Sequence, residues 1–125
     1  MVFMRIEIRR HGDEIPVVIV TFHTQKERFD SDYDKSKFFR ELHGWKQTVP
    51  RNGKRYVYER KGLLGEVPHV KVSESTFIVK TEEAKPVMDY FQEWADKVQV
   101  EMFEMMMRQQ EFMRRMCQDE VREEL

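Results

Sequence analysis

The segment from Trp45 to Lys61 combines cationic and aromatic side chains at a spacing that could bind a polyanion. It contains one acidic residue, Glu59, and six basic residues: Lys46, Arg51, Lys54, Arg55, Arg60 and Lys61. Asn52-Gly53 lies between two strand-like runs, which is a strong β-hairpin signal. Because side chains alternate along a strand, this pairing would place one group on each face: Trp45, Val49, Tyr56 and Tyr58 on the first, and Lys46, Arg55 and Val57 on the second.

This hairpin has two interpretations. Aromatic rings flanked by cations are surfaces on which single-stranded nucleic acid stacks, and a basic two-stranded ribbon can enter a duplex groove. Alternatively, the aromatic face belongs to the core and the cations are solvated edge residues that discourage sheet aggregation. Under the first interpretation, the residues predicted to contact nucleic acid are Lys46, Arg51, Lys54, Arg55, Tyr56 and Tyr58, together with Arg9 and Arg10 at the tip of an N-terminal hairpin.

An earlier segment is acidic instead of basic. Its residues Asp30, Asp32, Asp34 and Glu41 have the spacing of a calcium-binding EF-hand loop. The sixth position of that loop needs Gly for a sharp turn, and here it is Lys35. Carboxylates that favour a helix N-terminus explain the same residues. We therefore predict no metal and no cofactor, and keep these four residues as the weak metal-ligand candidates.

Catalytic signals are sparse. The four histidines are scattered, the single cysteine is Cys117, and no metalloprotease, Ser-His-Asp or phosphate-loop pattern is present. His23, close in sequence to Asp30 and Asp34, is the best candidate for a metal-assisted hydrolytic site. No catalytic residue is predicted, and a metal-dependent, nuclease-like hydrolase stays as one alternative.

Hydrophobic periodicity outlines the elements that would position these residues. Alternation in residues 1–10 and the apolar run 16–22 predict two strands of a hairpin, and 32–42 predicts a helix ended by Gly44. Residues 62–65 are expected to be a loop, and the strand parity of residues 70–79 predicts a break or bulge near Ser73-Glu74-Ser75. Pro86 must lie close to the start of the next helix.

The last third of the chain, from about Ala84 to Glu124, is predicted to be one long amphipathic, methionine-rich helix. Its apolar residues recur at spacings of three, four and seven, and no Gly or Pro follows Pro86. Such a helix is too long for a domain of this size to cover, so its distal half would join subunits or bind a partner. The predicted interface residues are Val98, Met102, Met105, Met106, Phe112, Met113 and Met116.

Together these elements predict an α+β fold, with an antiparallel, ferredoxin-like or related sheet of about five strands, one short helix and the long C-terminal helix. The domain would span residues 1–98, and residues 99–125 would be its helical extension. The element order resembles that of small dimeric nucleases. That resemblance implies a carboxylate at the end of the first core strand, where this chain has Thr21-Phe22-His23-Thr24.

Composition narrows the function classes. A net charge of -1 over 125 residues gives no overall field toward nucleic acid, so any attraction must be local. No run approaches a membrane span or a signal peptide, and one cysteine suits a cytoplasmic setting. We predict a non-enzymatic, nucleic-acid-associated or regulatory protein that forms a homodimer or binds a protein partner. The main alternative is an adaptor without nucleic-acid binding.

Overall fold

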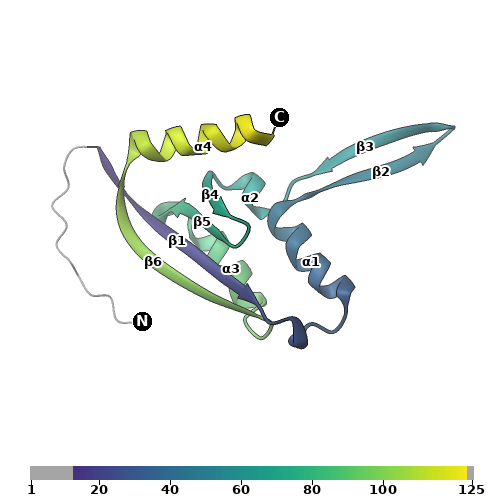
Figure 1. Ribbon diagram of the computed structural model, residues 1–125, viewed down its shortest axis with the longest axis horizontal. Coiled ribbons are helices and arrows are strands. Elements are labelled where there is room, and N and C mark those ends of the chain that lie inside the picture. Colours follow the sequence, from purple (N-terminus) through teal and green to yellow (C-terminus); the bar gives the residue numbers. More distant parts are fainter. Residues whose placement is uncertain (1–12, 124–125) are drawn as a thin grey trace.

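The computed structural model describes residues 13–123 and places side chains as far as Cys117. Its strands are β1 (Glu14–Thr24), β2 (Trp45–Arg51), β3 (Lys54–Arg60), β4 (His69–Ser73), β5 (Thr76–Lys80) and β6 (Val98–Arg108). Its α-helices are α1 (Asp32–His43), α2 (Leu63–Glu66), α3 (Lys85–Glu93) and α4 (Gln109–Glu123). Short 3-10 turns occupy Lys26–Arg28 and Thr81–Glu83. The chain is therefore mixed α+β, as predicted (Figure 1).

Four strands form one antiparallel sheet in the order β4-β5-β1-β6, and β2 pairs only with β3 in a separate two-stranded sheet. β1 lies inside the sheet, with β5 on one side and β6 on the other. Two β-α-β units, β1-α1-β4 and β5-α3-β6, are interleaved in this order. The β2–β3 hairpin is inserted into the first unit, between α1 and α2.

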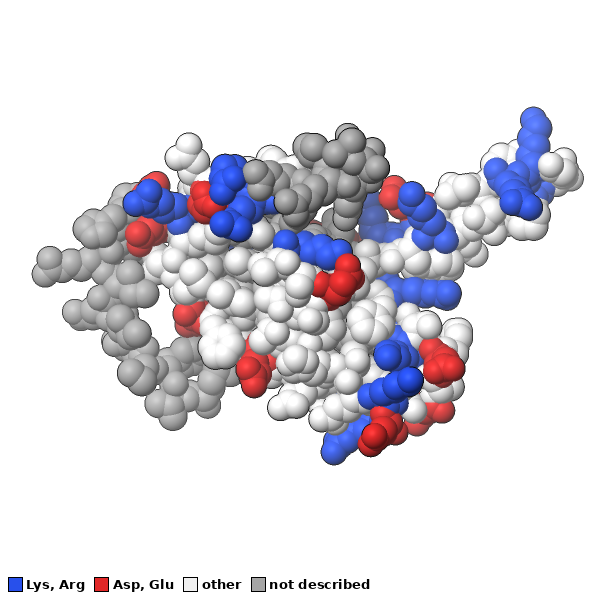
Figure 2. Space-filling model, viewed as in Figure 1, with Lys and Arg blue, Asp and Glu red and all other residues white. Residues whose placement is uncertain are grey.

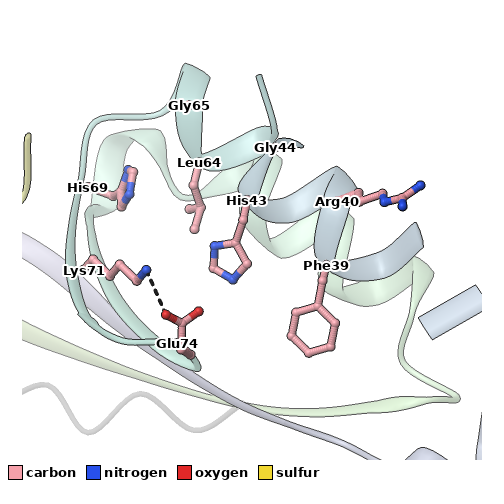
Figure 3. Close-up of a pocket in the computed structure, with 9 residues that line it drawn as sticks. All are labelled: Phe39, Arg40, His43, Gly44, Leu64, Gly65, His69, Lys71 and Glu74. Carbon is pink, nitrogen blue, oxygen red and sulfur yellow. Dashed lines mark hydrogen bonds and ion pairs between the residues drawn. The ribbon is translucent and has the colours of Figure 1, made fainter. Parts of the chain in front are cut away.

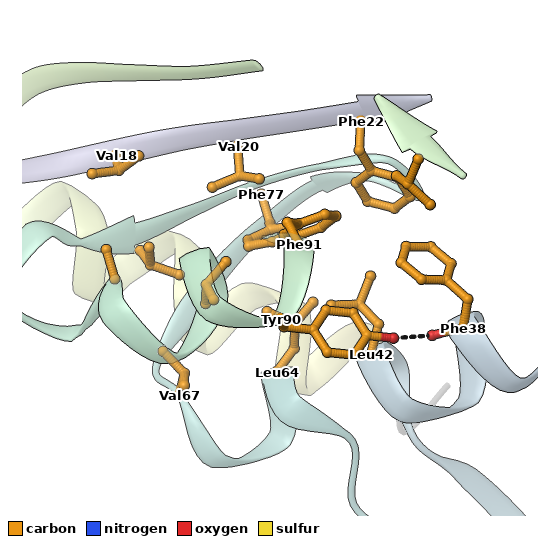
Figure 4. Packing of buried hydrophobic residues seen from close by; sticks show 14 residues of the cluster. Val18, Val20, Phe22, Phe38, Leu42, Leu64, Val67, Phe77, Tyr90 and Phe91 are labelled. Atoms are coloured by element: carbon orange, nitrogen blue, oxygen red, sulfur yellow. Dashed lines mark hydrogen bonds between the residues drawn. The ribbon is translucent and has the colours of Figure 1, made fainter. Parts of the chain in front are cut away.

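One face of the sheet carries the larger core, which is rich in phenylalanine. Val18, Val20 and Phe22 of β1 pack there against α1 and α3 (Figure 4). Phe38 of α1 lies edge-on to Phe22, with ring centroids 5.6 Å apart. The Tyr90 hydroxyl of α3 donates a 2.6 Å hydrogen bond to the Phe38 carbonyl oxygen, which joins the two helices above the sheet.

The other face is covered in part by α4. Phe112, which is fully buried, packs there with Val17, Val70 and Ile78. Farther along the same face, Phe103 and Met105 of β6 are 56% and 38% exposed. The sheet is thus a middle layer, with α1 and α3 on one side and α4 over part of the other.

The predicted C-terminal helix is wrong as a continuous element. It begins as expected, with Pro86 in its first turn, but α3 ends at Glu93 and residues 98–108 form β6. β6 pairs with β1 over eleven residues, from Val98 opposite Thr24 to Arg108 opposite Glu14. Val98, Val100 and Met102 alternate with polar residues and pack on the core, so the sheet outcompetes the helical spacing.

The predicted N-terminal hairpin also needs correction. Its first strand, residues 1–10, lies outside the described residues, but its intended partner is fully described. From Val17 to Thr21, β1 is paired on both sides, with β5 and with β6, so it has no free edge there for another strand. The main sheet has four described strands instead of about five.

Other local predictions fare better. The helix predicted over 32–42 is α1 (Asp32–His43). The Ser31 hydroxyl caps its start by accepting the Asp34 N–H, and Gly44 with φ of 85° ends it. The expected break near Glu74 is the turn between β4 and β5, with a register shift between Lys71 and Ser73. The loop predicted over residues 62–65 is wrong, because residues 63–65 belong to the one-turn helix α2. No described helix is long and apolar enough to cross a membrane.

Candidate nucleic-acid interface

The β2–β3 hairpin projects away from the body of the molecule, and we call residues 45–60 the arm (Figure 1). Each strand has seven residues, so the arm is roughly 23 Å long at about 3.3 Å per residue. Asn52 and Gly53 form its turn, with positive φ values of 51° and 77°, as an Asn-Gly hairpin turn requires. The predicted hairpin and its turn are confirmed.

The arm contributes no residue to either core cluster. Every residue of β3 is exposed, and in β2 only Gln47 and Val49 are partly covered. Tyr56 and Tyr58 are 44% and 42% exposed, and Trp45 is 37% exposed. The alternative in which this aromatic face is core is therefore wrong.

Register fixes which arm residues share a face. Val49 lies opposite Tyr56, Gln47 opposite Tyr58, and Trp45 opposite Arg60. Since directly opposed residues point to the same side, the three aromatic residues share one face, as predicted. Arg51 lies opposite Lys54 and brings two cations to the outer end of that face. The reverse face carries Lys46, Arg55 and the acidic Glu59.

Lysine and arginine side chains gather toward the outer end of the arm (Figure 2). Nearer the body, Arg60 is held on the aromatic face. Its Nε donates to Gln47 Oε1 at 3.1 Å, and its guanidinium lies 5.7 Å from the Tyr58 ring centroid. Arg40 of α1 lies over the Trp45 ring at 4.9 Å. Local positive charge is thus concentrated on a protein with almost no net charge.

The foot of the arm is anchored through glycine. Gly44 has a φ of 85°, and a Cβ there would lie 2.5 Å from the Arg60 carbonyl oxygen and 2.7 Å from the Gly62 nitrogen. Only a residue without a side chain allows the end of α1, the arm and residue 62 to approach so closely. This contact sets the direction in which the arm leaves the body.

Beside the foot lies an open cavity of about 520 Å³ (Figure 3). Its lining residues come from α1, α2 and the β4–β5 hairpin: Phe39, Arg40, His43, Gly44, Leu64, Gly65, His69, Lys71 and Glu74. A second hollow of about 400 Å³ shares His43, Gly44 and Gly65 with it and adds Lys46, Arg60 and Lys61 at the arm's foot. The linings of the two hollows thus combine cationic side chains with two carboxylates, Glu59 and Glu74.

The two cavity histidines differ in environment. Burial, followed by the charge of Lys71, lowers the pKa of His43. His69 donates from Nδ1 to the Val67 carbonyl oxygen at 2.9 Å. Lys71 binds Glu74 at 3.1 Å. The lining residues include no Ser, Thr or Cys, so they offer no hydroxyl or thiol nucleophile.

The four weak metal-ligand candidates do not form a cage. Asp34 and Asp30 both bind Lys97 Nζ, at 2.7 and 3.3 Å, and the Lys97 ammonium lowers the pKa of Asp34. Asp32 lies in the first turn of α1, and Glu41 pairs with Lys37 on the same helix. Exposed His23 lies on β1 opposite Gln99. Among the described residues, no group of three or more His, Cys, Asp or Glu could hold a metal.

The predicted interface residues are dispersed because their helix does not exist as one element. Val98 and Phe112 are buried inside the chain, Met102 packs against the first core cluster, and Met116 packs against the second. Met106 is partly buried, whereas Met105 and Met113 are 38% and 43% exposed. The heptad seam is absent, and the exposed remainder lies on β6 and α4.

Of the residues predicted to contact nucleic acid, six lie on the arm, and Arg9 and Arg10 lie outside the described residues. The prediction omitted Trp45 and Arg60, although alternation with Tyr56 and Tyr58 places them on the same face. It also missed the cavity, because His43 and His69 meet only through the packing of α1 and β4. Comparison of the chain with protein families, with characterised proteins and with solved structures finds no match.

Proposed function

We propose that this protein is a non-enzymatic, nucleic-acid-associated or regulatory protein that binds nucleic acid through its arm. The observation that supports this most strongly is the exposure of a long basic and aromatic hairpin that adds no residue to either core cluster of its own chain. A two-stranded ribbon alone is marginally stable in water, so an arm of this kind is best explained by a ligand that completes it. Its cations select a polyanion.

We also propose that the main sheet is ferredoxin-like. The strand order β4-β5-β1-β6, with α1 and α3 as the crossovers, is that of a ferredoxin-like sheet with an inserted arm and an added C-terminal helix. Fold alone gives no function. In this arrangement the sheet and helices act as a rigid base, and the arm carries the contact.

Charge reversal at the end of the arm tests the proposal. Arg51→Glu, Lys54→Glu and Arg55→Glu together should weaken binding to a labelled oligonucleotide by about tenfold or more and flatten its salt dependence, because phosphate contacts are lost. A matched control reverses three exposed lysines of the body, Lys26, Lys37 and Lys85, with the same change in net charge. Equal loss in both triple variants, or no binding by the wild-type protein, would refute the proposal.

A second candidate function is binding of a protein partner or a second copy at β6. Phe103 and Met105 are exposed on one face of an edge strand that pairs, among described residues, only with β1. Natural proteins usually cover or charge such edges. If this surface joins two copies, Phe103→Glu should convert a dimer to a monomer in light scattering, and an unchanged mass would count against it.

A further inference from the structure

We propose that the arm recognises single-stranded nucleic acid by stacking bases on its aromatic face. This inference rests on the nucleic-acid binding proposed above and names its substrate class. The aromatic face is defined by the side chains of Trp45, Gln47, Val49 and Arg51 on β2 and of Lys54, Tyr56, Tyr58 and Arg60 on β3.

The rings are spaced for an unstacked strand. Tyr56 and Tyr58 are two residues apart on β3, which separates them by roughly 6.7 Å, and Trp45 lies one further rank toward the body, opposite Arg60. Bases in a duplex rise by only about 3.4 Å and already cover one another. Rings at twice that interval can stack on bases only where the base faces are open, as in a single strand.

Charge on this face complements such a strand at both ends. Arg51 and Lys54 form the outer end, and Arg60 sits beside Tyr58 at the inner end with its guanidinium 5.7 Å from the ring. Arg40 continues the series from α1, at 4.9 Å over Trp45. The face has no carboxylate, since the arm's one acid, Glu59, pairs opposite Lys46 on the reverse side. Phosphates would meet cations before and after the stacked bases.

The exposure of the rings agrees with a ligand that covers them. Tyr56, Tyr58 and Trp45 are each between 37% and 44% exposed, although Arg60 lies over the Tyr58 ring and Arg40 of α1 over the Trp45 ring. In a duplex groove the ribbon's side chains would instead contact base edges and phosphates, because the stacked bases have no open faces there. If the arm binds a duplex groove, removing the tyrosine rings should change the affinity little. Tyrosine variants therefore distinguish groove binding from stacking on a single strand.

The test uses the full chain, with fluorescent oligo(dT), oligo(U) and a duplex of equal length as probes. Tyr56→Leu with Tyr58→Leu keeps apolar bulk and all charges but removes two stacking rings. Each lost stack costs about 5-fold or more in affinity, so the double variant should bind single strands about 25-fold more weakly, with an unchanged salt slope. Val57→Leu, on the reverse face and 63% exposed, is the matched control and should bind normally.

A spectroscopic signature checks the stacking directly. The chain has two tryptophans, so Trp94→Phe leaves only Trp45. A base that stacks near the Trp45 ring should quench the fluorescence of Trp45 on binding. Preference for oligo(U) or oligo(dT) identifies RNA or DNA, and either result supports the inference. Equal affinity for duplex, together with no effect of the tyrosine variants, overturns it and leaves arm binding intact. Failure of wild-type protein to bind any probe overturns the proposed function itself.

Discussion

Removing the Tyr90 hydroxyl perturbs a single hydrogen bond in the core and has a defined expected size. Tyr90 is 8% exposed, and its hydroxyl donates to the Phe38 carbonyl oxygen at 2.6 Å. Tyr90→Phe keeps the ring packing and deletes that bond. A buried hydrogen bond contributes about 1–1.5 kcal/mol net, so the free energy of unfolding at pH 7 should fall by about that amount. In urea the midpoint should drop by roughly 0.5–1 M.

The same variant carries a pH signature. Burial raises the pKa of Tyr90 above its ordinary value of 10.0, so the folded state keeps a proton that the unfolded state loses. This stabilisation is complete below pH 10.0 and declines at higher pH, by up to about 1.4 kcal/mol per pH unit, until the raised pKa is reached. The phenylalanine variant has no such group. The difference between the two proteins should therefore shrink above pH 10 and vanish near about pH 11.

Urea unfolding followed by tryptophan fluorescence between pH 7 and pH 11 measures both effects. Tyr33→Phe is the matched control, since Tyr33 lies on α1 and is 73% exposed, and it should change neither the midpoint nor its pH dependence. Equal stability of Tyr90→Phe and wild type at pH 7, or a constant difference up to pH 11, would refute this account of the α1–α3 contact.

Three further substitutions test other parts of the fold. Phe112→Ala empties the fully buried site between α4 and the sheet, so the free energy of unfolding measured in urea should fall by about 3–5 kcal/mol. The same change at the exposed Met113 should lower it by less than about 1 kcal/mol. Similar losses in the two variants would contradict the assignment of Phe112 to the buried face of α4. Gly44→Ala should destabilise the chain by more than about 2 kcal/mol because its Cβ meets the Arg60 carbonyl, while Gly65→Ala should be tolerated; a stable Gly44→Ala would argue against the close contact at the arm's foot. Asp34→Asn removes the ion pair with Lys97 and should lower the melting temperature at pH 7. Because Lys97 lowers the pKa of Asp34, wild type should lose this ion pair only as the pH falls below 3.8, and the difference in melting temperature should diminish in that range. A difference that does not change with pH would contradict the Asp34–Lys97 ion pair.

The parts of the fold that sequence predicted are those encoded locally. Asn52-Gly53 dictates a turn, Gly44 ends a helix, and Pro86 begins one, and each acts through its own backbone preference. The arm's faces followed from strand alternation around that turn. Whether those faces were core or solvent depended on the rest of the chain, which local pattern does not contain.

The region from Val98 to Arg108 was mispredicted because the spacing of its apolar residues fits both a helix and a strand. Methionine packs equally well on a helix or a strand, and helical spacings run through its apolar residues. The early alternation Val98-Gln99-Val100-Glu101-Met102 was the available strand signal. What decides the outcome is pairing with β1, about eighty residues away, which satisfies one edge of β1 along its whole length. The cavity beside the arm arises in the same non-local way.

Excision of the arm is the measurement that tests the central claim most directly. Trp45 and Arg60 are cross-strand partners, so residues 46–59 can be replaced by a two-residue Asn-Gly turn without moving the body. Because the arm adds nothing to either core cluster, the shortened chain should keep its melting temperature within a few degrees and lose oligonucleotide binding. A folded, armless protein that binds the oligonucleotide as tightly as the full chain would contradict the claim.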